Sequence, residues 1–282
     1  MRIINTFEQI HSCFKNNLFD LDSWRKYTKQ FSSELSEKCE RDARNYDYCR
    51  DILPVIHNVV SHHEAAQLAN NSFIAVTQQL NRNIKKLFEN DIELDVILYL
   101  GLCNGAGWAT TLDGRNAILL GIEKIIELNW QNETALRALL FHEIGHIWHK
   151  TYGNFSPKTQ SKGEDSLVQL YQEGIAMVCE QILCQDNHYY HQNQNDWLTW
   201  CTSNITNIKQ EYLQRIDNNI STQDFFGDWC SYKHHSDVGY YLGCVFIQYL
   251  QQQYPLVEIA KLNVRQLYQY FKTFVLSTSY LS

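Results

Sequence analysis

The stretch LLFHEIGHIWH, residues 139–149, contains the pattern HExxH: His142 and His146 are four residues apart, and Glu143 directly follows the first histidine. On an α-helix, residues four apart project from the same face, one turn above each other. Both imidazoles can therefore reach one metal ion, and Glu143 can reach a water molecule on that ion. The pattern predicts a zinc site carried by a helix.

The residues that flank this pattern favour a helix. Asn132 is a good N-cap, and Glu133 places negative charge in the first turn, where the helix dipole favours it. Gly153 provides a stop signal. An apolar stripe on one face would pack against a core: Leu136, Leu139, Leu140, Ile144 and Ile147.

Three short segments upstream of the helix predict a small sheet. Residues 95–100 and 117–122 are rich in aliphatic and β-branched side chains, and residues 108–111 follow a glycine-rich break. Asp113-Gly114 is a strong hairpin turn. We expect an antiparallel or mixed sheet next to the HExxH helix. We also expect strand 117–122 to lie at its edge, where an extended peptide can add a further strand.

The other segments have helical character. Residues 1–90 predict a helical N-terminal region packed on the core. Downstream, the periodicity predicts four more helices, over residues 166–183, 196–216, 238–253 and 257–274. The sequence therefore predicts an α+β fold that is predominantly helical.

Composition limits the classes of partner. Of 282 residues, 44% are hydrophobic and 20% are charged, and the net charge is −7 without a basic cluster, so we expect no nucleic-acid partner. The longest apolar run, around residues 240–249, is too short to span a bilayer, so we expect no membrane partner. The sequence leaves the oligomeric state open.

Cysteine usage and the N-terminus predict a compartment. The nine cysteines form no CxxC pair, which is typical of reduced thiols. The first residues lack the uninterrupted apolar segment of a secretory signal. We expect a cytoplasmic protein, or one exported without a cleavable signal peptide.

A catalytic zinc site needs a third protein ligand besides the two histidines. A metzincin would place glycine three residues after His146 and histidine six residues after it. The chain has His149 and Tyr152 there, which excludes that class. The best remaining ligand is Glu173, on a predicted helix and followed by a glycine, and Glu164, beside a polar loop, is the alternative.

The HExxH segment and the segment with Glu173 together resemble a known family. LLFHEIGHIWHK followed by a helix with EGIA (residues 173–176) resembles the gluzincins, the zinc peptidases whose third ligand is glutamate. His235 and the segment GYYLG (residues 239–243) resemble a motif of the thimet-oligopeptidase-like peptidases, in which a histidine precedes a Gly-Tyr-x-x-Gly helix that faces the zinc. Short bacterial proteins known as predicted zinc-dependent proteases show a similar order and suit this length. The resemblance covers about residues 95–254.

This resemblance implies a zincin-like catalytic domain over residues 91–282 that acts as a zinc-dependent endopeptidase or oligopeptidase on a peptide or protein substrate. The implied cofactor is Zn²⁺. His142, His146 and Glu173 would hold the metal, and Glu143 would be the general base. Tyr240 and His235 are the candidates for donating to the oxyanion, followed by Tyr241. Cys244 stands where the oligopeptidases have a tyrosine, so that residue's role has no counterpart here.

Two alternatives remain open beside a peptidase. The chain can be a non-catalytic protein that keeps a zincin scaffold to bind a partner or a metal, or a zinc hydrolase of a non-peptide substrate. Glu143 argues against the first alternative, because a purely structural zinc site has no use for a base and is usually filled by four cysteine or histidine ligands.

Overall fold

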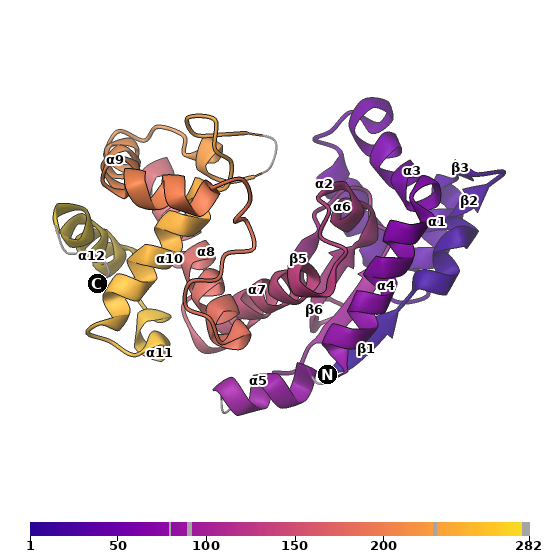
Figure 1. Ribbon diagram of the computed structural model, residues 1–282, viewed down its shortest axis with the longest axis horizontal. Helices are drawn as coiled ribbons and strands as arrows, with labels where there is room; N and C mark the ends of the chain where they lie inside the picture. Colours follow the sequence, from indigo (N-terminus) through magenta and orange to yellow (C-terminus); the bar gives the residue numbers. More distant parts are fainter. Residues whose placement is uncertain (79, 89–91, 228–229, 278–282) are drawn as a thin grey trace. The chain divides into compact units, whose positions relative to one another are not determined.

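The computed structural model describes residues 1–282 except 79, 89–91, 228–229 and 278–282 (Figure 1). The chain divides into two compact units, Met1–Glu143 and Ile144–Ser282. The division falls within helix α7 (Glu133–Tyr152), which is one continuous helix. The domain boundary expected at residues 90 and 91 lies outside the described residues.

The first unit contains a four-stranded mixed sheet. Its strands follow the order β1-β4-β6-β5, in which β1, β4 and β6 run parallel and β5 runs antiparallel to β6. The last three strands match the predicted segments closely. The four are β1 (Arg2–Asn5), β4 (Asp95–Tyr99), β5 (Gly107–Leu112) and β6 (Arg115–Gly121).

The predicted hairpin turn is present and joins β5 to β6. Asp113 and Gly114 both have positive φ, 46° and 77°, as a two-residue type I′ turn requires. The prediction that strand 117–122 forms an edge is wrong, because β6 is paired on both sides, with β4 and with β5. The edge on this side of the sheet is β5.

We expected residues 1–90 to be helical, but this region also contains the strands β1, β2 (Phe14–Lys15) and β3 (Leu18–Phe19). Its first strand, β1, pairs with β4, and a short hairpin, β2–β3, precedes the α-helices. The side chain of Arg2 forms an ion pair with Asp95, next to which it lies in the sheet. The other elements of this unit are η1 (Phe7–Cys13), α1 (Leu21–Thr28), α2 (Leu35–Ala43), η2 (Tyr48–Ile52), α3 (Leu53–Ser61), α4 (His63–Thr77), α5 (Leu80–Phe88) and α6 (Ile122–Glu127).

Helix α1 packs at the end of strand β4 through two fully buried aromatic residues. Trp24 donates from Nε1 to the carbonyl of Leu100 over 2.8 Å, and the hydroxyl of Tyr27 accepts the amide N–H of Leu100 over 2.9 Å. Satisfying these backbone groups lets the chain leave the sheet within the core.

The second unit is helical in the described residues, and α8 packs against α9, α10 and α12 (Figure 1). Together the two units give an α+β fold that is predominantly helical, as predicted. No described helix is both long and apolar enough to cross a membrane. The elements after α7 are α8 (Lys162–Cys184), α9 (Trp197–Asp217), η3 (Gln223–Phe225), α10 (Val238–Gln251), α11 (Leu256–Ile259) and α12 (Val264–Leu276).

Candidate metal centre

Helix α7 carries the HExxH pattern on an unbroken helical backbone. The side chain of Asn132 accepts the amide N–H of Ala135 over 3.0 Å, so Asn132 caps the start of α7 as predicted. His142 and His146 therefore lie one turn apart on one face.

Helix α8 brings a carboxylate to these histidines. Oε2 of Glu173 lies 3.3 Å from Nε2 of His146, and both side chains keep a small exposed fraction, 17% and 13%. The ligand atoms of His142, His146 and Glu173 all lie within 4.8 Å of one another. Two imidazoles, one carboxylate and partial access to solvent match the ligand set of a catalytic zinc site.

Glu164, the alternative ligand, is used elsewhere. It lies in the first turn of α8, where Ser161 caps the helix by accepting the amide N–H of Glu164. The Glu164 carboxylate accepts the amide N–H of Gln160 over 2.5 Å. It belongs to neither of the His/Glu groups found in the described part of the chain.

A second His/Glu group shares His142 and adds Glu180 and His191. Glu180 is completely buried, and Nδ1 of His191 lies 2.9 and 3.0 Å from its two carboxylate oxygens. Glu180 is seven residues after Glu173, so both carboxylates lie on the same face of α8. Sequence reasoning missed His191, which lies in a loop without periodicity.

Glycines allow the close approach of helices in the second unit. A Cβ at Gly145 would lie 2.8 Å from Cα of Ala176, so α7 and α8 meet there. A Cβ at Gly174 would collide with the carbonyl oxygen of Gly243, so α8 and α10 cross at this pair. Gly174, which follows Glu173, therefore faces α10. Gly145, within the HExxH pattern, faces α8.

The carboxylate of Glu143 lies against edge strand β5. Its Oε2 accepts the amide N–H of Ala109 over 2.7 Å. A Cβ at Gly107 would lie 2.5 Å from Oε1 of Glu143 and 2.8 Å from Cδ1 of Leu139, so glycine leaves the space that this carboxylate fills. The carboxylate of Glu143 is thus held against the first residues of β5, Gly107 to Ala109.

Tyr240 and Tyr241 have different surroundings, as expected for consecutive residues on a helix. The ring of Tyr240 lies 6.4 Å from that of His191 between centroids, near the second His/Glu group. Tyr241 is buried, and its hydroxyl donates to Oγ1 of Thr202 over 3.3 Å. Of the two, Tyr240 is the one next to a residue of the candidate centre.

His235 stacks on Trp200 of α9, with ring centroids 3.8 Å apart and planes at 11°. Its Nδ1 lies 3.0 Å from the carbonyl oxygen of Lys233. A carbonyl only accepts, so Nδ1 carries a proton, and Nε2 of the neutral ring presents a lone pair. His235 belongs to neither His/Glu group of the described residues.

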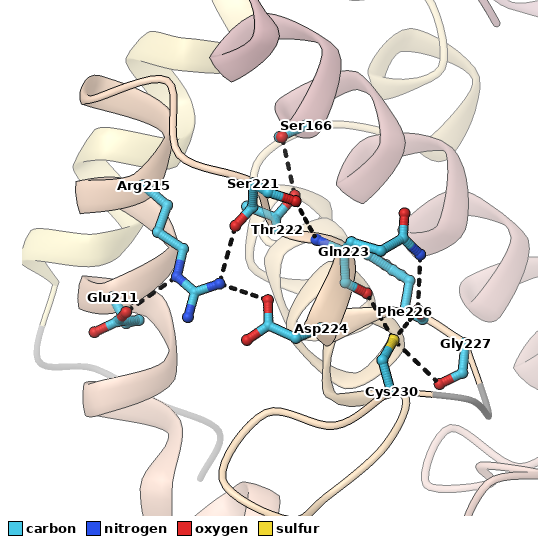
Figure 2. Close-up of polar contacts among 10 residues, drawn as sticks. All are labelled: Ser166, Glu211, Arg215, Ser221, Thr222, Gln223, Asp224, Phe226, Gly227 and Cys230. Carbon is cyan, nitrogen blue, oxygen red and sulfur yellow. Dashed lines mark hydrogen bonds and ion pairs between the residues drawn. The ribbon is translucent and has the colours of Figure 1, made fainter.

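Residues 221–227, upstream of His235, take part in a polar network (Figure 2). Arg215 of α9 donates to Glu211 over 3.0 Å and forms an ion pair with Asp224. Thr222 donates to Ser166 of α8 over 2.9 Å, and the thiol of Cys230 lies 3.1 Å from two carbonyl oxygens. The contacts of Thr222 and Asp224 attach this stretch to α8 and α9.

His149 packs in the core of the second unit. It is fully buried, with edge contacts to the rings of Phe155 and Tyr171 at 5.3 and 4.7 Å. Burial, followed by the nearby His146, lowers its pKa to about 3. His149 is therefore neutral and serves as a packing residue.

No protein-family model, curated protein or solved structure matches this chain. The function proposed below therefore rests on the residues and on their geometry.

Proposed function

We propose that this protein is a zinc-dependent peptide hydrolase, an endopeptidase or oligopeptidase of gluzincin type. The supporting observation is the group of His142, His146 and Glu173, whose ligand atoms lie within 4.8 Å of one another. Two imidazoles with one carboxylate suit zinc and leave a fourth position for water. Magnesium and calcium prefer sets made mainly of oxygen ligands.

Glu143 is the proposed general base. A zinc ion held by the three ligands would polarise the scissile carbonyl and lower the pKa of a bound water to about 7. Glu143, which follows the first histidine on α7, would take the proton of that water and later pass it to the leaving amine. Its hydrogen bond from Ala109 orients the carboxylate before substrate arrives.

Strand β5 is the proposed binding surface for the substrate main chain. It is an edge strand, and Glu143 lies beside its first residues. A peptide in extended conformation would pair with the outward-facing N–H and C=O groups of β5. Such pairing recognises the backbone and gives little preference for particular side chains.

Tyr240 is the better candidate for stabilising the oxyanion. A phenol donates a hydrogen bond at neutral pH, and Tyr240 lies next to His191. His235 directs its Nδ1 proton at the carbonyl of Lys233, so it would donate from Nε2 only in its cationic form. A donor directed at the developing oxyanion stabilises the transition state selectively.

The experiment that tests this proposal compares peptide-library cleavage by the wild type, Glu143→Gln and the control Glu164→Gln, with bound zinc measured for each. We expect Glu143→Gln to keep zinc and fold and to lose hydrolysis, because the amide is nearly isosteric but cannot take a proton. We expect Glu164→Gln to remain active.

A zinc-loaded wild type that leaves every library peptide intact contradicts the proposal. That result favours the non-catalytic scaffold or the hydrolase of a non-peptide substrate. Near-wild-type cleavage by Glu143→Gln removes Glu143 from the role of base.

A further inference from the structure

The hairpin β5–β6 determines which backbone groups of β5 face the open edge of the sheet. Leu112 and Arg115 flank its two-residue turn and form a hydrogen-bonded pair in this geometry. Along β5, residues whose backbone groups bond to β6 then alternate with residues whose backbone groups face outward. Ala106, just before β5, fits this alternation, because its carbonyl accepts the amide N–H of Gly121 over 3.0 Å. The odd-numbered residues of β5 therefore face outward.

Two of these outward-facing groups are already engaged. The amide N–H of Ala109 donates to Glu143 over 2.7 Å. The carbonyl oxygen of Thr111 accepts a hydrogen bond from Nζ of Lys38, which belongs to α2. The outward edge of β5 therefore has the proposed base at Ala109 and a lysine ammonium two residues further on, at Thr111.

Lys38 is held at this position by further contacts. Its Nζ lies 3.4 Å from Oγ1 of Thr110 and 3.8 Å from the carboxylate of Glu34. Glu34 accepts the amide N–H of Asp113 over 3.3 Å, and Ser33 donates to the Asp113 carboxylate over 2.6 Å. The start of α2 thus binds the turn end of the hairpin. A lysine placed over an edge strand blocks the pairing of another strand.

We propose that Lys38 closes the substrate-binding edge at Thr111 and limits how far a peptide can extend past the scissile bond on that side. The inference rests on the function proposed above. Ala109, beside Glu143, and Thr111 are two residues apart, about 6.6 Å along a strand. A bound peptide can therefore pair for about two residues beyond Glu143 before it meets the Lys38 ammonium.

The test uses two series of peptides around one scissile sequence, extended one residue at a time on the N-terminal side or on the C-terminal side. Mass spectrometry measures kcat/KM for the wild type, Lys38→Met and Lys38→Arg. The exposed Lys29→Met is the matched control. Methionine keeps the length of the apolar stem of Lys38 and removes the ammonium, and arginine keeps a cationic donor.

For the wild type we expect kcat/KM to stop rising, or to fall, once more than about two residues lie on one side of the scissile bond. In that same series, Lys38→Met should raise kcat/KM of the longer peptides about tenfold over wild type, because one or two main-chain hydrogen bonds become available. Lys38→Arg and Lys29→Met should keep the wild-type limit.

An unchanged length limit in Lys38→Met, with cleavage intact and the thermal midpoint within a few degrees of the wild type, overturns this inference alone. A gain in both series also overturns it, because it indicates general loosening of the site. If neither the wild type nor any variant cleaves any peptide, the proposed function fails, and the inference fails with it.

Discussion

Nε2 of His146 lies 3.3 Å from Oε2 of Glu173, although the two residues belong to different helices, α7 and α8. An imidazole and a carboxylate at this distance can share a proton or a metal ion. His142, one turn earlier on α7, adds a second imidazole to the group. These three side chains together form a group that can hold a metal ion.

The variant Glu173→Ala should lose bound zinc, because removing one of three protein ligands opens the site. Glu164→Ala should keep its zinc, since the Glu164 carboxylate accepts the amide N–H of Gln160. Elemental analysis after dialysis against buffer with a weak chelator distinguishes the two variants. Zinc retained by Glu173→Ala and lost by Glu164→Ala would reverse the assignment of the third ligand.

The variant Glu180→Gln should bind zinc about 10- to 100-fold more weakly, because a buried carboxylate close to a ligand imidazole favours the ligand geometry and raises its basicity. Glu180 is buried, pairs with His191, and has a carboxylate oxygen within 4.8 Å of a ring nitrogen of His142. Competition with a chromophoric chelator measures the affinity, and Glu164→Gln is the control. Equal zinc affinity of Glu180→Gln and wild type would leave Glu180 a purely packing role.

The variant Tyr240→Phe should lower kcat on the order of 10²–10³-fold with zinc content unchanged, because the oxyanion loses a donor. Tyr241→Phe should be nearly neutral for kcat, since its hydroxyl contacts Thr202. Steady-state kinetics on one peptide substrate compares the two variants. A crippled Tyr241→Phe would shift the proposed donor by one residue, and two fully active variants would reduce the Gly-Tyr resemblance to packing.

Glu123 should make stability depend on pH. It is fully buried, and burial raises its pKa from 4.5 to about 7, although the amide groups of Gly101 and Cys103 donate to its carboxylate. Between these two pH values the folded protein holds a proton that the unfolded chain releases. The resulting stabilisation is complete below pH 4.5 and is lost as pH rises through about 7.

The contribution amounts to about 3 kcal/mol over this window. Urea unfolding at pH 5 and pH 8 measures the free energy of unfolding of the wild type and of Glu123→Gln. From pH 5 to pH 8 this free energy should fall by about 3 kcal/mol more for the wild type than for the variant. The glutamine stays uncharged and keeps an acceptor for the loop amides. The same pH dependence in both proteins would show that Glu123 does not titrate in this window.

The sheet illustrates what local sequence patterns predict. Strands β4 and β6 are continuous apolar segments, and the Asp113-Gly114 turn has the positive φ angles that such a pair favours. Strand β1 escaped prediction, because four residues carry no usable period and their partner is far along the chain. Its placement depends on pairing with β4 and on the ion pair between Arg2 and Asp95, 93 residues apart.

The candidate site divides in the same way. The spacing within α7 predicts that His142 and His146 share a face, and the helix with Glu173 supplies a carboxylate near them. His191 and Lys38 reach their positions through contacts between distant segments, which no local spacing encodes. The stacking of His235 on Trp200 likewise depends on how a loop packs against α9.

The zinc content of the wild type, measured together with peptide hydrolysis before and after chelation, tests the proposed zinc peptidase directly. We expect about one zinc ion per chain, loss of hydrolysis when that ion is removed, and recovery of hydrolysis when zinc is restored. Hydrolysis that survives complete removal of the metal, or a folded chain that binds no zinc, would contradict this proposal.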